Sequence, residues 1–153
     1  MTGRLVVVGV GNPFRGDDGA GLAVAERLRD RVPAGVEVVP CEQEPSRLID
    51  AWREAKCAIV VDALEPGTQP GGLRRFDASD APLPAQVFRS STHAFGVGEA
   101  IELSRALGSL PRSIVVYGIE GADFGAGEGL TPSVEDAVER AARAVLQDVE
   151  ANC

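Results

Sequence analysis

The sequence predicts a single α/β domain over residues 1–153, with a twisted, mostly parallel sheet of about five strands and helices on both faces. Short apolar runs at residues 5–8, 57–61 and 113–119 show no regular alternation of polar and apolar positions. Such runs are typical of strands that are buried on both faces of a parallel sheet. The segments between them carry apolar residues at helical spacing, and strands that alternate with helices indicate the α/β class.

The remaining elements follow from the same patterns and from their stop signals. The expected strands, in chain order, cover residues 5–8, 36–40, 57–61, 73–76 and 113–119. The expected helices cover residues 20–31, 45–55 and 93–107, and a last helix begins at residue 132. Proline and glycine separate most of these segments, as is typical of turns. The right-handed crossover rule places the strands at 5–8 and 57–61 side by side.

Individual residues indicate where some elements lie or begin. The strand at 73–76 is expected at a sheet edge, because Arg74 and Arg75 do not suit a strand buried on both faces. Hydroxyl side chains are favoured at helix N-caps. The candidate N-caps are Ser90, Ser91 and Thr92 for the helix at 93–107, and Thr131, followed by Pro132, for the last helix.

The composition limits the partners and the compartment. The chain has 15 basic and 23 acidic residues, a net charge of −8, and no cluster of Lys and Arg. This argues against nucleic acid or an anionic membrane as the main partner. No run approaches the ~18 apolar residues of a transmembrane helix, and the N-terminus lacks the features of a signal peptide. Cys41, Cys57 and Cys153 have no metal-binding spacing and are expected to be reduced thiols. We therefore expect a cytoplasmic protein. We also expect it to be a monomer.

Three segments carry side chains that could perform chemistry at one edge of the sheet. Asp17 and Asp18 follow the glycine loop at 9–16, and Asp62 ends an apolar run. His93, the only histidine, lies at the start of the helix expected at 93–107. Carboxylates and an imidazole from separate segments would form a mixed oxygen and nitrogen site that suits zinc or nickel. Structural roles remain open: helix-dipole partners for the aspartates at 17 and 18, a turn cap for Asp62, and a surface position for His93.

Two other kinds of site are less well supported. Residues 9–14 begin like the Gly-x-Gly-x-x-Gly loop of a dinucleotide site, with Glu42 after the second strand for a ribose. However, Phe14 replaces the third glycine, and the acidic loop would repel a pyrophosphate. A thiol hydrolase that uses Cys41 and His93 is disfavoured, because the acidic residues beside Cys41 oppose formation of the thiolate. No Gly-x-Ser-x-Gly elbow occurs.

Residues 9–21, Gly-Val-Gly-Asn-Pro-Phe-Arg-Gly-Asp-Asp-Gly-Ala-Gly, resemble the opening motif of the hydrogenase maturation proteases. These endopeptidases trim the C-terminus of the nickel-loaded large subunit of [NiFe]-hydrogenases. The resemblance continues through residues 60–63, 92–93, 118–120 and 129–134, and so spans nearly the whole chain. The loop at 41–45 departs from the family's glycine-containing pattern, which leaves open the hydrogenase subgroup that is the substrate.

The resemblance implies a function, a cofactor and a partner. Asp18, Asp62 and His93 match the family's three metal-binding positions, and the metal would be nickel supplied by the large-subunit precursor. We expect zinc or another divalent ion to substitute in vitro. Asp17 and Asp18 are the candidate general bases. The candidate substrate-binding residues are Gly11, Asn12 and Gly121, in the two glycine-rich loops beside the metal site. A non-catalytic chaperone that binds nickel or the precursor is the alternative.

Overall fold

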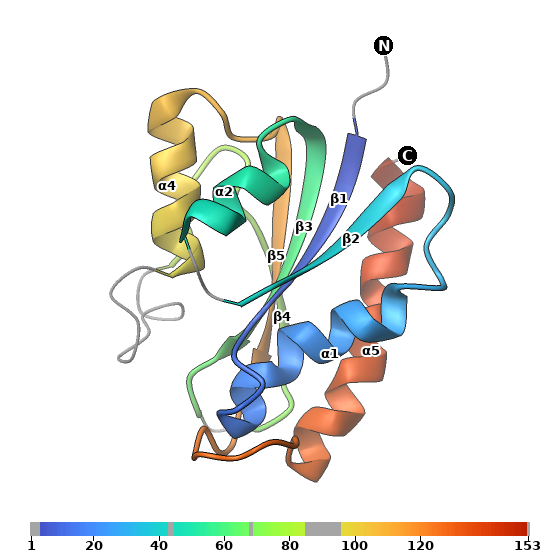
Figure 1. Ribbon diagram of the computed structural model, residues 1–153, viewed down its shortest axis with the longest axis vertical. Helices are drawn as coiled ribbons and strands as arrows, with labels where there is room; N and C mark the ends of the chain where they lie inside the picture. The colour runs from blue at the N-terminus through green and yellow to red at the C-terminus, as the bar shows by residue number, and fades with distance from the viewer. Residues whose placement is uncertain (1–3, 43–44, 68, 85–95, 153) are drawn as a thin grey trace.

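The computed structural model describes residues 4–42, 45–67, 69–84 and 96–152, which form a five-stranded α/β domain (Figure 1). The strands are β1 (Arg4–Val10), β2 (Val36–Cys41), β3 (Ala55–Leu64), β4 (Leu73–Asp77) and β5 (Ser113–Glu120). The helices are α1 (Ala20–Leu28), α2 (Pro45–Trp52), α4 (Val97–Leu107) and α5 (Pro132–Asn152), and a 3-10 turn, η1 (Gly16–Gly19), precedes α1. None of the helices in the described ranges has an apolar stretch long enough to span a bilayer.

The strand order is β2-β1-β3-β5-β4. All neighbouring strands are parallel except β4, which pairs antiparallel with β5 at the edge of the sheet. The order confirms the predicted pairing of β1 with β3 and the predicted edge position of β4. The edge position of β4 leaves room for a charged side chain to find a partner. The Arg75 guanidinium donates hydrogen bonds to the Asp148 carboxylate of α5 at 2.9 and 3.0 Å.

Helices cover both faces of the sheet, as the apolar runs predict. Helices α1 and α5 lie on one face, and α2 and α4 lie on the other (Figure 1). Successive residues of β1 point to opposite faces, so that Val7 packs with α1 and α5 whereas Val6 and Val8 pack with α2 and α4. On the second face the fully buried indole of Trp52 donates a hydrogen bond to Ser104 Oγ at 2.9 Å, which joins α2 to α4.

Strand β3 differs from the predicted run at 57–61 because it extends to Leu64. Asp62 therefore lies inside the strand and pairs with Gly118 of β5, whereas the ladder between β1 and β3 ends at the pair of Gly9 with Val61. The prediction that the strand ends at Asp62 is wrong because pairing with β5 outweighs the poor strand preference of a carboxylate. Asp62 is the first residue of β3 after the last pair with β1, that of Gly9 with Val61.

Three helix boundaries also differ from the predictions. Helix α1, expected to reach residue 31, ends at Leu28. Helix α2 ends at Trp52, before residue 55, because the chain already enters β3 at Ala55. Helix α4 begins at Val97 and not near residue 93, because Gly96 is its N-cap and donates its N–H to Glu99 Oε1 at 2.7 Å. The predicted hydroxyl N-caps of this helix, at positions 90–92, lie outside the described residues.

Close packing between α1 and the sheet fixes the position of the η1 turn. A Cβ atom at Gly21 would lie 2.3 Å from the carbonyl oxygens of both Val10 and Val61. At Gly9 a Cβ would lie 2.3 Å from the carbonyl oxygen of Gly21. Only glycine fits at these two positions, and α1 therefore begins directly against the carboxyl end of β1 and against Val61 of β3.

Candidate functional site

The η1 turn carries two adjacent buried carboxylates, Asp17 and Asp18, at the carboxyl edge of the sheet. The loop before the turn holds it through the backbone: Asn12 N–H donates to the carbonyl oxygen of Asp18 at 3.2 Å. Gly11 lies so close to the turn that a Cβ there would be 2.1 Å from the same oxygen. The glycine loop therefore positions the carboxylates by direct contact with their backbone.

The Asp17 carboxylate accepts hydrogen bonds from the segment that leads into α5. Oδ2 accepts from the N–H groups of Ala122 and Asp123 at 2.8 and 2.9 Å. Oδ1 accepts from Thr131 N–H at 2.8 Å, and the Thr131 hydroxyl lies 2.9 and 3.1 Å from the two oxygens. This arrangement joins η1 to the start of α5, and we call it the Asp17 latch.

Burial opposes the charge of Asp17, yet the hydrogen bonds from Thr131, Ala122 and Asp123 outweigh it and hold the pKa below the ordinary value of 3.8. Asp17 is therefore an anion at neutral pH, and both of its oxygens are engaged by donors of the protein. A carboxylate in this state is suited to holding two loops together.

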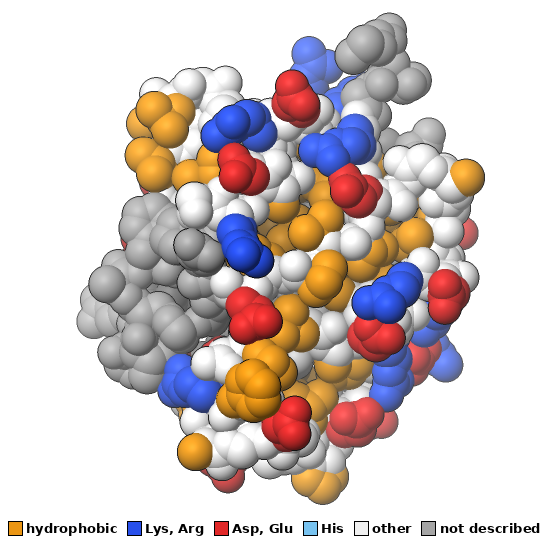
Figure 2. Space-filling view, in the orientation of Figure 1, with side chains coloured by type: hydrophobic (Ala, Val, Ile, Leu, Met, Phe, Trp, Pro, Cys, Tyr) orange, Lys and Arg blue, Asp and Glu red, His pale blue; other side chains and the backbone are white. Residues whose placement is uncertain are grey.

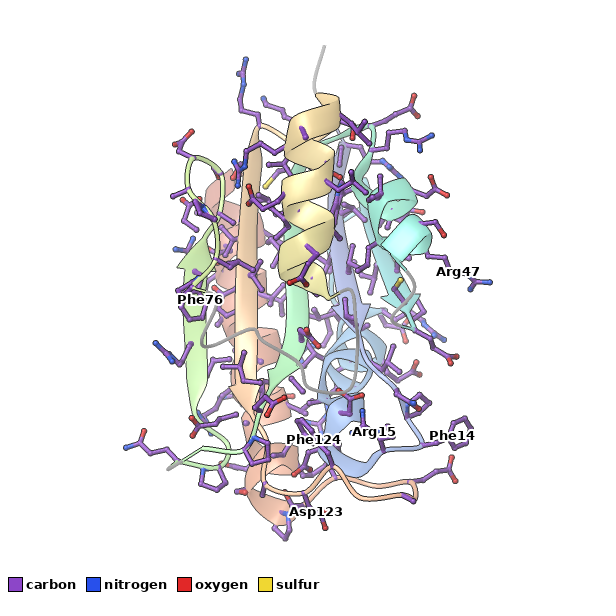
Figure 3. The ribbon with its side chains drawn as sticks, turned by 90° about the vertical axis from the view of Figure 1, so that its left-hand side faces the viewer. Phe14, Arg15, Arg47, Phe76, Asp123 and Phe124 are labelled. Atoms are coloured by element: carbon purple, nitrogen blue, oxygen red, sulfur yellow. The ribbon has the colours of Figure 1, made fainter. Side chains whose placement is uncertain are left out.

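Two further backbone contacts join the same loops. Gly16 N–H donates to the carbonyl oxygen of Gly127, and Gly127 N–H donates to that of Phe14, both at 2.9 Å. Between the loops, the Arg15 guanidinium lies 6.0 Å from the centre of the Phe124 ring, and the two side chains meet below the sheet in Figure 3. The glycine-rich segment at 121–131 is thus attached both to η1 and to the loop that precedes it.

Asp62 is a buried carboxylate that faces the charge of Asp18. Its Oδ1 accepts a hydrogen bond from Ala63 N–H at 2.8 Å. Burial, together with the charge of Asp18, raises the pKa of Asp62 to about 8. The Arg15 guanidinium lies 3.6 Å from Asp18 Oδ2. A divalent cation held between these two carboxyl groups would relieve both the cost of burying their charges and the repulsion that develops when Asp62 ionises.

The third predicted metal ligand, His93, lies outside the described residues. Within the described ranges, no group of three or more His, Cys, Asp and Glu side chains forms a metal site. The structure therefore brings together the aspartates from η1 and β3, and the role of the imidazole stays a prediction.

The predicted substrate-binding residues lie in the two loops beside these carboxylates. Gly11 donates its N–H to the carbonyl oxygen of Cys41 at 3.1 Å, and Gly121 donates to that of Leu64 at 3.1 Å. Asn12 Oδ1 accepts from Phe14 N–H at 2.9 Å. These contacts shape the loops, and contact with a substrate stays a prediction.

Two features of the site have no simple signature in the sequence. Thr131 was expected only as an N-cap, yet its hydroxyl binds Asp17, which precedes it by more than a hundred residues. Gly21 was part of an expected helix, and its close contact with β1 and β3 depends on the fold. This glycine supplies the close helix-to-strand packing that Phe14, as the third position of a Gly-x-Gly-x-x-Gly loop, would not allow.

Comparison with known proteins identifies relatives of this chain and of its fold. The family model described as "Hydrogenase maturation protease" matches residues 22–148. The Hydrogenase 3 maturation protease of Escherichia coli is 31% identical over 137 residues, which cover 88% of this chain and 83% of the relative. The hydrogenase expression/formation protein HupD of Bradyrhizobium diazoefficiens is 30% identical over 138 residues, covering 88% of this chain and 72% of that protein.

Some relatives are longer than this chain. The match to HupD of Thiocapsa roseopersicina is 27% identical over 147 residues and spans 66% of that protein. The chain thus covers about two thirds of the length of some curated relatives that it matches.

Solved structures share the fold. The hydrogenase maturating endopeptidase HybD from Escherichia coli superposes with a TM-score of 0.84 at 24% identity, over 97% of this chain and 93% of that chain. The [NiFe] hydrogenase maturation protease HycI from Thermococcus kodakarensis gives a TM-score of 0.75 at 26% identity, over 96% and 92% of the two chains. Both likenesses confirm the predicted α/β fold, and the matches together confirm the family that the sequence resembles. This chain belongs to the hydrogenase maturation protease family.

Proposed function

We propose that this chain, an endopeptidase by its family, removes a C-terminal peptide from the nickel-loaded large-subunit precursor of a [NiFe]-hydrogenase. The observation that carries the proposal is the pair of buried carboxylates, Asp18 and Asp62, whose charges interact at the carboxyl edge of the sheet. Ligands bind at this edge in open α/β folds. A site that is acidic and buried favours a cation brought by the substrate.

Nickel in the precursor is the cation that we assign to this pair, with His93 as the third ligand. Three protein ligands would leave positions for atoms of the precursor, which brings its own metal. Binding at this site would then depend on nickel having been inserted. This gives the enzyme a way to distinguish a loaded precursor from an empty one.

The two glycine-rich loops would hold the tail that is cut. Their glycines let an extended peptide approach the backbone near Gly11, Asn12 and Gly121. Nickel would polarise the scissile carbonyl or a bound water. Asp17 is committed to its latch, and we therefore assign proton transfer from the attacking water to Asp18.

Intact-mass measurement of the precursor tests the proposal. The precursor is prepared with and without nickel and incubated with the wild-type chain, Asp62→Asn or His93→Ala. We expect the wild-type chain to remove a C-terminal peptide from the loaded precursor alone, and both variants to leave it intact. An intact mass with a stable complex would indicate the chaperone instead, and equal cleavage without nickel would refute the role of the metal.

A further inference from the structure

An exposed aromatic residue stands beside the candidate site. Phe14 is 61% exposed, and of the large apolar side chains in the described part of the chain only Leu103 and Leu107, both on α4, are also classed as exposed. Figure 3 shows the Phe14 ring extending outward from the loop between β1 and η1, whereas Arg15 turns inward toward Phe124. Phe14 therefore points toward solvent, whereas its neighbour Arg15 points toward the glycine-rich segment at 121–131.

The backbone of Phe14 is held on both sides. Its N–H donates to Asn12 Oδ1 at 2.9 Å, and its carbonyl oxygen accepts from Gly127 N–H at 2.9 Å. A side chain on a fixed backbone loses little further freedom when it is buried by a partner. Aromatic anchors of this kind are enriched among the residues that dominate protein interfaces.

A shallow groove of about 280 Å³ lies next to this loop. Its lining residues are mostly apolar or glycine: Pro13, Gly16, Gly19, Leu22, Ala23, Glu128, Gly129 and Leu130. Gly16 and Gly19 belong to η1, so the groove is continuous with the turn that carries the candidate catalytic carboxylates. A partner seated here would have its neighbouring chain directly at the site.

The surrounding surface suggests the chemistry of the partner. Figure 2 shows hydrophobic side chains running from β2 to the loop between β1 and α1 on this face. Glu128 is the one charged residue among those that line the groove, it is exposed, and the chain carries a net charge of −8. A complementary surface therefore presents an apolar side chain flanked by Lys or Arg.

We propose that Phe14 and the groove beside it form the docking surface for the folded body of the large-subunit precursor, through an apolar side chain flanked by basic residues. This inference rests on the proposed function and adds the surface that holds the body while its tail enters the site. Docking of the body contributes to affinity and leaves the chemical step unchanged. Loss of Phe14 should therefore raise KM and leave kcat unaltered.

The test measures binding and cleavage of nickel-loaded precursor by the wild-type chain, Phe14→Ala, Glu128→Lys and the control Leu107→Ala. Leu107 is 66% exposed, which matches Phe14, and it lies at the end of α4. We expect Phe14→Ala to raise KM and Kd roughly tenfold or more. Glu128→Lys should also weaken binding, most strongly at low salt, and Leu107→Ala should behave as the wild type.

A second arm uses a precursor that lacks its C-terminal tail, which should still bind the wild-type chain and bind Phe14→Ala more weakly. Wild-type cleavage with unchanged KM and Kd for Phe14→Ala would overturn the docking surface and leave the proposed function standing. Binding that depends on Phe14 without cleavage would support the surface and count against the endopeptidase. A wild-type homodimer that dissociates in Phe14→Ala, with precursor binding unchanged, would assign the surface to a second copy of the chain and overturn the proposal.

Discussion

Removal of one hydroxyl from the Asp17 latch should destabilise the protein by a measurable amount. Thr131→Val keeps the shape of the side chain and deletes a donor that lies 2.9 and 3.1 Å from the carboxylate oxygens. A hydrogen bond to a charged group contributes about 1.5–3 kcal/mol, which corresponds to a fall in Tm of roughly 3–12 °C for a domain of this size. Asp17→Asn removes the charge and replaces one acceptor oxygen with an NH2 donor. It strands at least one backbone N–H, that of Thr131, and should cost more, roughly 2–6 kcal/mol.

Calorimetry of both variants at neutral pH measures these losses, with Ser133→Ala as the control. Ser133 is exposed in the first turn of α5, and its replacement should change stability by less than about 0.5 kcal/mol. Cleavage should fall in Asp17→Asn because the η1 turn also carries Asp18. A Tm for Thr131→Val that equals the wild-type value would refute the latch.

The same latch predicts a dependence on acid. The folded pKa of Asp17 lies below the ordinary value of 3.8, because its hydrogen bonds outweigh the effect of burial. The stabilisation is therefore complete above the unfolded pKa and is lost as the pH falls through the folded pKa. The stability difference between the wild-type chain and Asp17→Asn should accordingly narrow below about pH 4.

Three further substitutions test other parts of the structure. Gly21→Ala forces a Cβ against backbone oxygens of β1 and β3, and it should lower the free energy of unfolding by about 1–3 kcal/mol or more in thermal unfolding. The control Gly98→Ala, whose Cβ would meet nothing within 4 Å, should stabilise α4. Equal Tm values for the two variants would refute the close packing. Asp62→Asn should raise the Tm of the metal-free protein more at pH 8 than at pH 5. Burial and a neighbouring carboxylate raise the folded pKa of Asp62 to about 8, and the wild-type chain therefore loses stability as the pH rises toward that value. The same change in Tm at both pH values would contradict this. Ser104→Ala leaves the buried Trp52 N–H without its acceptor and should cost about 1–3 kcal/mol in chemical denaturation, so that an unchanged midpoint would show the bond to be unimportant.

The sheet was largely predictable from the sequence because strands buried on both faces leave a strong pattern. Residues 57–61 form the central part of β3, and the crossover rule places this strand beside β1. The extension of β3 through Asp62 was not predictable from the local sequence. A carboxylate after an apolar run is typical of a strand end, and only the pairing with Gly118 of β5 keeps the chain extended.

The start of the helix at 97–107 was also not predictable from the local sequence. Ser90, Ser91 and Thr92 are good N-cap residue types, yet the cap is Gly96, which carries no side chain. The stabilising contact comes from Glu99, which accepts a hydrogen bond from the Gly96 N–H. A glycine before a helical pattern is typical of many loops, and so the cap was not recognisable without the structure.

In the candidate site, the meeting of Asp18 with Asp62 was predictable because both follow from sheet topology. The difference between Asp17 and Asp18 was not predictable, since the two residues are adjacent and chemically identical. Their environments separate them: the segment that ends at Thr131 engages both oxygens of Asp17, whereas Asp18 faces the buried carboxylate on β3.

Anomalous scattering from crystals of the chain soaked with nickel or zinc would show whether the carboxylates and the imidazole share one ion. We predict one ion that is bound by carboxylate oxygens of Asp18 and Asp62 and by a ring nitrogen of His93. An ion bound elsewhere, or one that leaves either aspartate or the histidine beyond coordination distance, would contradict this prediction.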